Sequence, residues 1–293
     1  MNRVQNIFVG MVFAGAAIVA GSAHAQETVV RDRFSDEIVG QGPDLVFIPG
    51  LASSRDTWKS VAERLKDHYR LHLIQVAGFA GEPARANAQG PVLVPTAEAI
   101  DAYLVEQHLA PATIIGHSLG GTMILYLAEH HPADLKKAMI VDSLPFYATL
   151  MMGPNATVET AQPMADGIRS GKSKMTDQQR AQMMAIMASA PSDKDMIAGW
   201  SRASDPSAVA NALADDLTLD LRPGLGTVTT PITLVYPDYA PVGRPKGTAD
   251  KMYHATYASL KPITFVPATN SVHFVMLDQP AQFNAALDAF LAQ

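Results

Sequence analysis

The sequence predicts an α/β protein with a doubly wound, mostly parallel sheet and an inserted helical segment. Strand-like apolar runs alternate with segments of helical spacing along most of the 293 residues. A Gly-x-Ser-x-Gly pattern at residues 116–120 stands between a short apolar run and a helical run. Residues 145–222 lack strand-like runs and are rich in Met, Ala, Ser, Asp and Gln. Strict alternation of strand and helix favours a sheet covered by helices on both faces.

The first part of the chain supplies the first strands of this sheet. Modest strands at 28–34 and 37–39 are expected to form an antiparallel entrance to the sheet. Thr96 is a candidate N-cap for the helix that follows the loop ending at Pro95. The pattern then predicts further strands at 44–48, 71–76, 113–115 and 137–141, with helices at 57–67, 96–109 and 122–131.

The segment 145–222 is too long and too helical to be a loop. We expect it to be a helical cap that lies over the functional site. Its predicted helices are 158–170, 176–188, 193–204 and 206–218. The alternation then resumes with strands at 231–236 and 263–266 and helices at 248–260 and 280–291.

The N-terminus has the pattern of a secretory signal peptide. It combines Arg3, an apolar run at 7–20 and the small-residue sequence Ala23-His24-Ala25. The run is shorter than the roughly 20 residues that span a bilayer. We therefore expect residues 1–25 to be removed on export to the periplasm or beyond. The core would then comprise 26–144 and 223–293, with the cap at 145–222.

Composition narrows the function classes. The formal net charge of −6 gives no basic surface for nucleic acid or anionic lipid, and the absence of cysteine excludes thiol catalysis, disulfides and zinc–thiolate sites. The run Glu129-His130-His131 lacks the order of a zinc-protease motif. With no phosphate or dinucleotide fingerprint either, we expect no metal and no cofactor. The expected partner is a small-molecule substrate, and the sequence leaves the oligomeric state open.

Ser118 is the candidate nucleophile. A strand, Gly-x-Ser-x-Gly and a helix together predict a nucleophile elbow, a sharp turn that exposes the serine hydroxyl. The glycines are needed because a side chain there would collide with the neighbouring strand or helix. The new helix would aim backbone N–H groups at developing negative charge.

A serine hydroxyl needs a base within hydrogen-bond reach. Of the nine histidines, His273 lies in a loop between the last strand and the last helix, where it could return over the sheet edge to Ser118. His117 lies inside the elbow and should point away from Ser118. The remaining histidines belong to the signal peptide or to helices, helix ends and a strand start. We therefore expect His273 to be the base.

The order of elbow, helical insertion and late histidine resembles the α/β-hydrolase superfamily over essentially the whole mature chain. Pro49-Gly50-Leu51 resembles the His-Gly-x oxyanion turn of that family, with Pro in place of His. Residues 273–280 resemble its histidine loop and final helix. The resemblance implies an α/β-hydrolase fold and a Ser–acid–His hydrolase. It also implies that the amides of Leu51 and Leu119 hold the oxyanion.

The acid of this triad departs from the family pattern. A carboxylate should orient the imidazole and stabilise the imidazolium. In the family it usually follows the strand after the cap, a few residues past a glycine. Here that strand ends without a glycine, and Asp238 arrives about two residues early. Asp142, which closes the preceding strand, is the alternative, as in some capped relatives. We favour Asp238.

Several mostly apolar side chains are expected to line the substrate pocket, which would suit a small or medium acyl or aromatic substrate. They come from the loops near Ser118, from the start of the cap and from the residue after the base: Ser53, Phe79, Phe146, Tyr147 and Phe274.

The most favoured function is a secreted hydrolase of carboxylic esters. Hydrolysis of an amide, lactone or carbon–carbon bond, or acyl transfer, would use the same parts and stays an alternative. The displaced acid also leaves open a protein of another class, a non-catalytic binder of a small apolar ligand.

Overall fold

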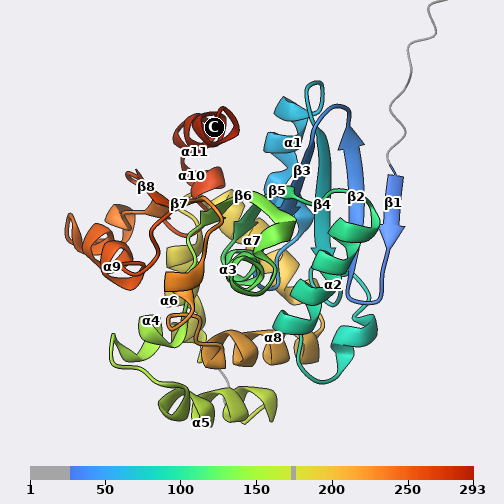
Figure 1. Cartoon of the computed structure of the whole chain (residues 1–293). Coiled ribbons are helices and arrows are strands. Elements are labelled where there is room, and N and C mark those ends of the chain that lie inside the picture. Colours follow the sequence, from blue (N-terminus) through green and yellow to red (C-terminus); the bar gives the residue numbers. More distant parts are fainter. Residues whose placement is uncertain (1–26, 173–175) are drawn as a thin grey trace, which may run out of the picture.

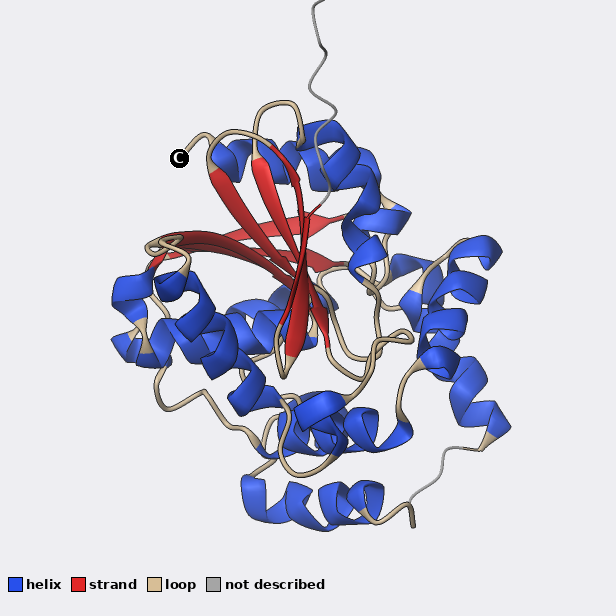
Figure 2. Ribbon diagram, turned by 90° about the vertical axis from the view of Figure 1, so that its right-hand side faces the viewer, coloured by secondary structure: helices blue, strands red, loops and turns tan. Residues whose placement is uncertain are grey.

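A computed structural model describes residues 27–172 and 176–293. The predicted signal peptide lies outside the described residues. Within them, eight strands form one twisted sheet in the order β1-β2-β4-β3-β5-β6-β7-β8, with helices packed around it (Figures 1 and 2). The strands are β1 (Glu27–Val30), β2 (Phe34–Gly40), β3 (Asp44–Ile48), β4 (Arg70–Val76), β5 (Ala112–His117), β6 (Leu135–Val141), β7 (Ile232–Pro237) and β8 (Ile263–Ala268).

The sheet has the predicted mostly parallel character. Strands β4, β3, β5, β6, β7 and β8 pair in parallel, whereas β1 and β2 pair antiparallel, as the expected entrance. The fold class that the sequence predicts is therefore confirmed.

Alternate side chains of the central strands enter two separate cores. On β5, Ile114 belongs to one apolar cluster and Ile115 to the other, because successive side chains of a strand point to opposite faces. Helices α2 (Leu93–Glu106), α3 (Leu119–His130) and α9 (Thr248–Thr256) contribute to the first cluster. Helices α1 (Lys59–Leu65), α10 (Val275–Asp278) and α11 (Pro280–Leu291) contribute to the second. The sheet is thus covered on both faces.

A run of helices between β6 and β7, residues 148–218, is called here the helical insertion. It has a small apolar core, which includes Ala161 and Leu217 together with Phe146 from the segment just before α4. Helices α4, α5 and α8 lie together below the sheet in Figure 1. The insertion comprises α4 (Ala148–Met152), α5 (Val158–Arg169), α6 (Asp177–Met187), α7 (Pro191–Ala203) and α8 (Pro206–Thr218), of which only α4 was not predicted.

Across the two described stretches, no helix is both long enough and apolar enough to cross a bilayer.

Helix α2 begins at Leu93, a turn before the predicted N-cap. Thr96 is buried inside the helix, so its assignment as the cap was wrong. Pro95 is tolerated because a first-turn residue needs no N–H acceptor within the helix. The amides of Val92 and Leu93 donate instead to Asp215 Oδ2 of α8, at 2.6 and 3.1 Å. The cap comes from a position 123 residues away, which no local rule can detect.

Asp215 therefore joins the helical insertion to the core. Its other oxygen, Oδ1, accepts a hydrogen bond of 2.7 Å from Arg169 Nη2 of α5. Both oxygens of one buried carboxylate are thus used, one toward α2 and the other toward α5.

We predict that Asp215→Ala lowers the free energy of unfolding by about 2 kcal/mol, because it leaves the buried Val92 and Leu93 amides without an acceptor. Urea unfolding followed by circular dichroism measures the change. Asp195→Ala removes an exposed carboxylate of α7 and serves as the control, with an expected change within about 0.5 kcal/mol. An equal effect of the two substitutions would contradict the capping role.

Candidate active site

Ser118 occupies a strained turn between β5 and α3. Its backbone has φ 52° and ψ −120°, a conformation rare for a residue with a side chain. The turn is held by the Ser118 amide, which donates to Val141 O at 2.9 Å, and by the Ser118 carbonyl, which accepts from Gly121 N at 2.7 Å. Such strain persists only where the surroundings enforce it. The strand–turn–helix context predicted for the elbow is present.

The glycines that flank Ser118 lie where no side chain fits. A Cβ at Gly116 would stand 2.5 Å from the carbonyl oxygen of Gly120. A Cβ at Gly120 would stand 2.5 Å from the carbonyl oxygen of Ile48 on β3. The elbow therefore packs backbone against backbone, as the sequence predicted.

The turn after β3 lies against the elbow. A Cβ at Gly50 would come within 3.1 Å of Ser118 Cβ, so Leu51 follows a residue that contacts the nucleophile. Ser53 shapes this turn, because its amide donates to Gly50 O at 3.3 Å and its hydroxyl to Leu51 O at 3.1 Å. Leu119 is the first residue of α3, and first-turn amides have no acceptor within their helix. Of the predicted oxyanion residues, Leu119 thus directly follows the candidate nucleophile, and Leu51 belongs to the turn that lies against it.

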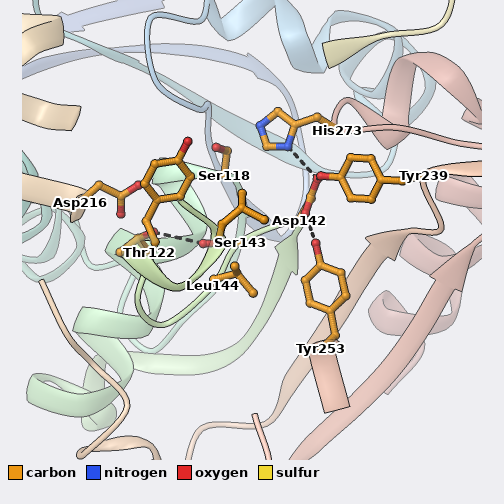
Figure 3. A pocket seen from close by; sticks show the side chains of 11 residues that line it. Ser118, Thr122, Asp142, Ser143, Leu144, Asp216, Tyr239, Tyr253 and His273 are labelled. Atoms are coloured by element: carbon orange, nitrogen blue, oxygen red, sulfur yellow. Dashed lines mark hydrogen bonds and ion pairs between the residues drawn. The ribbon is translucent and has the colours of Figure 1, made fainter. Parts of the chain in front are cut away.

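His273 is paired with the carboxylate of Asp142. The distance from His273 Nδ1 to Asp142 Oδ2 is 2.7 Å (Figure 3). Asp142 follows β6 with φ 47°, and its carboxylate is buried. Tyr239 donates its hydroxyl to Oδ2 at 2.6 Å, and Tyr253 donates its hydroxyl to Oδ1. Burial raises the pKa of Asp142, but His273 and these hydroxyls lower it more, so the net pKa lies below its usual value.

This geometry corrects the preference for Asp238. The Asp238 side chain accepts hydrogen bonds from the amides of Ala240 and Ser271, at 3.0 and 3.3 Å, and so stabilises the turn after β7. The next residue, Tyr239, has a left-handed backbone with φ 56° and reaches Asp142. The loop after β7 therefore supplies a hydroxyl donor to Asp142, and the carboxylate that pairs with His273 directly follows β6.

The backbone of His273 is held on both sides. Its amide donates to Ile186 O of α6 at 3.0 Å, and its carbonyl accepts from His117 Nε2 at 3.1 Å. His117 lies under the His273 loop, with the ring centroids 4.4 Å apart. Burial, aided by the nearby His273, lowers the pKa of His117 well below its usual value, so the ring is neutral. The helical insertion and the elbow thus position the candidate base together.

A small cavity of about 40 Å³ opens at Ser118 and His273 (Figure 3). Of the predicted pocket residues, Tyr147 lines it. The rest of the lining comes from α3, the ends of β6 and β7, α9 and the helical insertion: Thr122, Asp142, Ser143, Leu144, Leu150, Asp216, Tyr239 and Tyr253.

The other predicted pocket residues do not line this cavity. Ser53 is buried in the turn after β3, and Phe79 is buried in the core beneath the sheet end. Phe146 belongs to the core of the helical insertion, with the Arg222 guanidinium 4.5 Å from its ring centre. Phe274 packs on His117, with the ring centroids 4.4 Å apart. Ser53 is committed to its turn and the three phenylalanines to packing, so the assignment of these four residues to the lining of this cavity was wrong.

Sequence reasoning missed the polar part of the lining. Thr122 follows Ser118 by one helical turn, a spacing that places both on the same side of α3 and could have identified it. Ser143 directly follows Asp142. Asp216 gives no such signal, because nothing local distinguishes it from Asp215, which caps α2.

A possible metal cluster among the described residues lies elsewhere. Ligand atoms of Asp101, His131 and Asp134 lie within 4.8 Å of one another, near the end of α3 farthest from Ser118. None of these residues lines the cavity.

The model of the alpha/beta hydrolase family matches residues 45–286, and the chain belongs to this family. A pimeloyl-[acyl-carrier protein] methyl ester esterase of Vibrio vulnificus (strain YJ016) is 36% identical over 109 residues, which are 37% of this chain and 40% of that enzyme. The esterase of the same name from Nitrosomonas europaea is 24% identical over 261 residues, 86% of this chain and 97% of its own.

Solved structures share the fold. A hydrolase from Pseudomonas aeruginosa PA01 superposes with a TM-score of 0.72 at 18% identity, covering 94% of this chain and 100% of its own. The enol-lactonase from Burkholderia xenovorans LB400 gives a TM-score of 0.70 at 15% identity, covering 89% of this chain and 96% of its own.

The pairing of Asp142 with His273 predicts which carboxylate supports the reactivity of Ser118. Asp142→Asn should slow labelling of the protein by a fluorophosphonate at least about 100-fold, because the imidazole loses its orienting charge. Asp238→Asn should label within about twofold of the unaltered protein, since an amide oxygen can still accept the Ala240 and Ser271 amides. Labelling rates are read by gel fluorescence. Slow labelling of Asp238→Asn with normal labelling of Asp142→Asn would reverse the assignment.

Proposed function

We propose that the chain is a serine hydrolase that cleaves carboxylic esters of small molecules. The observation that carries this proposal is the juxtaposition of Ser118, in a strained elbow, with His273 on the same cavity and Asp142 on the far side of the imidazole. A nucleophile, a base and an orienting acid in this order are the requirements of acyl transfer.

The geometry supports the following course of reaction. Because Asp142 engages Nδ1 of His273, Nε2 is the nitrogen left to accept the proton of Ser118 as its Oγ attacks the ester carbonyl. The amides of Leu51 and Leu119 would hold the oxyanion of the tetrahedral intermediate. His273 then protonates the departing alcohol, and water, deprotonated by the same nitrogen, releases the acid from Ser118. Asp142 stabilises the imidazolium in both halves.

The relatives favour an ester over the other bonds that this arrangement can break. The two sequence relatives described above carry the name of a methyl ester esterase. The match to the first of them spans 40% of its length. Lactones, which are cyclic esters, are the second candidate substrate class, because an enol-lactonase is among the structural neighbours. The alternative of a non-catalytic binding protein was motivated by the early position of Asp238. Because Asp142 pairs with His273 instead, that motivation no longer applies.

The same proposal covers the surroundings of the site. Residues 145–222 would act as the cap, because Tyr147, Leu150 and Asp216 from this segment line the cavity. The pattern of residues 1–25 supports export to the periplasm or the medium.

The proposal predicts that the protein hydrolyses p-nitrophenyl esters of short acids and is labelled by a fluorophosphonate. Ser118→Ala should lose labelling entirely and lower kcat by at least about 1,000-fold, because the nucleophile is gone. An acyl chain-length series, followed by the absorbance of the released p-nitrophenolate, measures turnover.

Added methanol serves as the control for acyl transfer, since a transferase would partition product toward the methyl ester. Equal turnover by Ser118→Ala, or a wild-type protein that neither labels nor turns over any ester, would refute the proposal.

A further inference from the structure

Asp216 is a buried carboxyl that lines the cavity and has no place in the reaction described above. It lies on α8 of the helical insertion and is 8% exposed. Its Oδ1 has no hydrogen-bond partner among the described residues. Burial raises the pKa of Asp216 to about 7. The charge of the adjacent Asp215 adds to this rise, and the hydroxyl of Thr122 opposes it.

The neighbouring carboxylate shows what a structural role would look like. Asp215 uses both oxygens, to cap α2 and to bind Arg169. Asp216 leaves a buried oxygen unpaired beside the candidate nucleophile. An unpaired buried polar atom is unfavourable, and a ligand that supplies a donor recovers the lost hydrogen bond.

The part of the cavity around Asp216 is polar. Thr122 and Ser143 share a hydrogen bond of 3.1 Å, and Figure 3 shows this pair between Asp216 and Asp142. The phenol of Tyr147 lines the same cavity, and burial, together with the charge of Asp216, raises its pKa to about 12. Such a lining fits a polar group better than the aliphatic chain or aromatic ring that the sequence suggested.

The distance of this polar region from the nucleophile limits where such a group can lie in a substrate. Thr122 lies one turn after Ser118, and its amide donates to the Ser118 carbonyl at 3.1 Å. Ser118, Thr122 and Asp216 line the same cavity, whose volume is only about 40 Å³. A group that meets Asp216 therefore lies a few bonds from the carbonyl that Ser118 would attack.

We propose that Asp216 binds a hydrogen-bond-donating group of the substrate, a hydroxyl or an ammonium, carried a few bonds from the scissile ester. The substrate class is then a polar, hydroxylated or aminated ester, and Asp216 is a specificity-determining residue. This inference rests on the proposed function, because it concerns the substrate of the same site.

The test compares esters that differ in a single group. The acyl series consists of p-nitrophenyl 3-methylbutanoate, 3-hydroxybutanoate and 3-aminobutanoate, and the alcohol series of propyl and 2-hydroxyethyl butanoate. In at least one series the wild type should favour the donor-bearing ester over its methyl counterpart by at least about tenfold in kcat/KM. The two series show which side of the ester meets Asp216, and the hydroxyl and amino arms distinguish the two donors.

Substitution of Asp216 should remove the preference for donor-bearing esters but should not stop the cleavage of esters. Asp216→Leu should abolish the preference in kcat/KM for the donor-bearing ester, mainly through the KM of that ester. Hydrolysis of the methyl-bearing ester should persist. Asp216→Asn, which keeps an acceptor without a charge, should lose the preference for the amino ester and retain part of that for the hydroxyl ester. It also serves if Asp216→Leu does not fold.

Glu129→Gln is the matched control. Glu129 is another carboxyl whose pKa burial raises to about 7, but it lies near the opposite end of α3 from Ser118 and does not line the cavity. Its substitution should leave the ratios unchanged. The inference is overturned if the wild type shows no preference in either series, or if Asp216→Leu and Asp216→Asn keep it. Hydrolysis of the methyl-bearing esters in that case leaves the proposed function standing. A wild type that hydrolyses none of the esters refutes both.

Discussion

The carboxyl edge of the sheet is assembled around the buried carboxylate of Asp142. A charge in the interior is tolerated only with several hydrogen-bond donors, and separate elements bring them here. His273 comes from the loop after β8, Tyr239 from the loop after β7 and Tyr253 from α9. The loops after β7 and β8 and helix α9 therefore each have one side chain fixed by the same pair of oxygens. The orientation of the candidate base follows from that arrangement, as does the path of the chain between β7 and α9.

Local patterns in the sequence were sufficient for the fold and for bringing Ser118 and His273 to one cavity as the candidate nucleophile and base. The alternation of strands and helices predicts the parallel sheet, and the elbow pattern predicts the turn at Ser118, because both depend on residues close together in the chain. The choice between Asp142 and Asp238 depends on something else. Both follow neighbouring strands, and which one turns toward His273 is decided by left-handed backbone turns at Asp142 and Tyr239. Those turns form in the packed protein and leave no signal in the sequence.

The cavity lining was predicted less well for a related reason. Phe79, Phe146 and Phe274 are near the site in the chain, but each finds an apolar partner to pack against and turns away. The polar lining comes from Thr122, Ser143 and Asp216. The positions of Thr122 and Ser143 relative to Ser118 and Asp142 could have indicated them, whereas no local pattern distinguishes Asp216. Hydrophobicity therefore identified the core correctly and misidentified the pocket.

The capping of α2 by Asp215 has a consequence for how the protein can change over evolutionary time. An insertion on which the core did not depend could be exchanged without loss of core stability. Here the core depends on a carboxylate that belongs to the insertion, because the buried Val92 and Leu93 amides have their acceptor on α8. A transplanted insertion without an acceptor at that position would destabilise the first turn of α2. Exchange of α8 therefore requires a compensating change near residue 92. Exchange of α4 or α6 does not remove this acceptor, because Asp215 lies on α8.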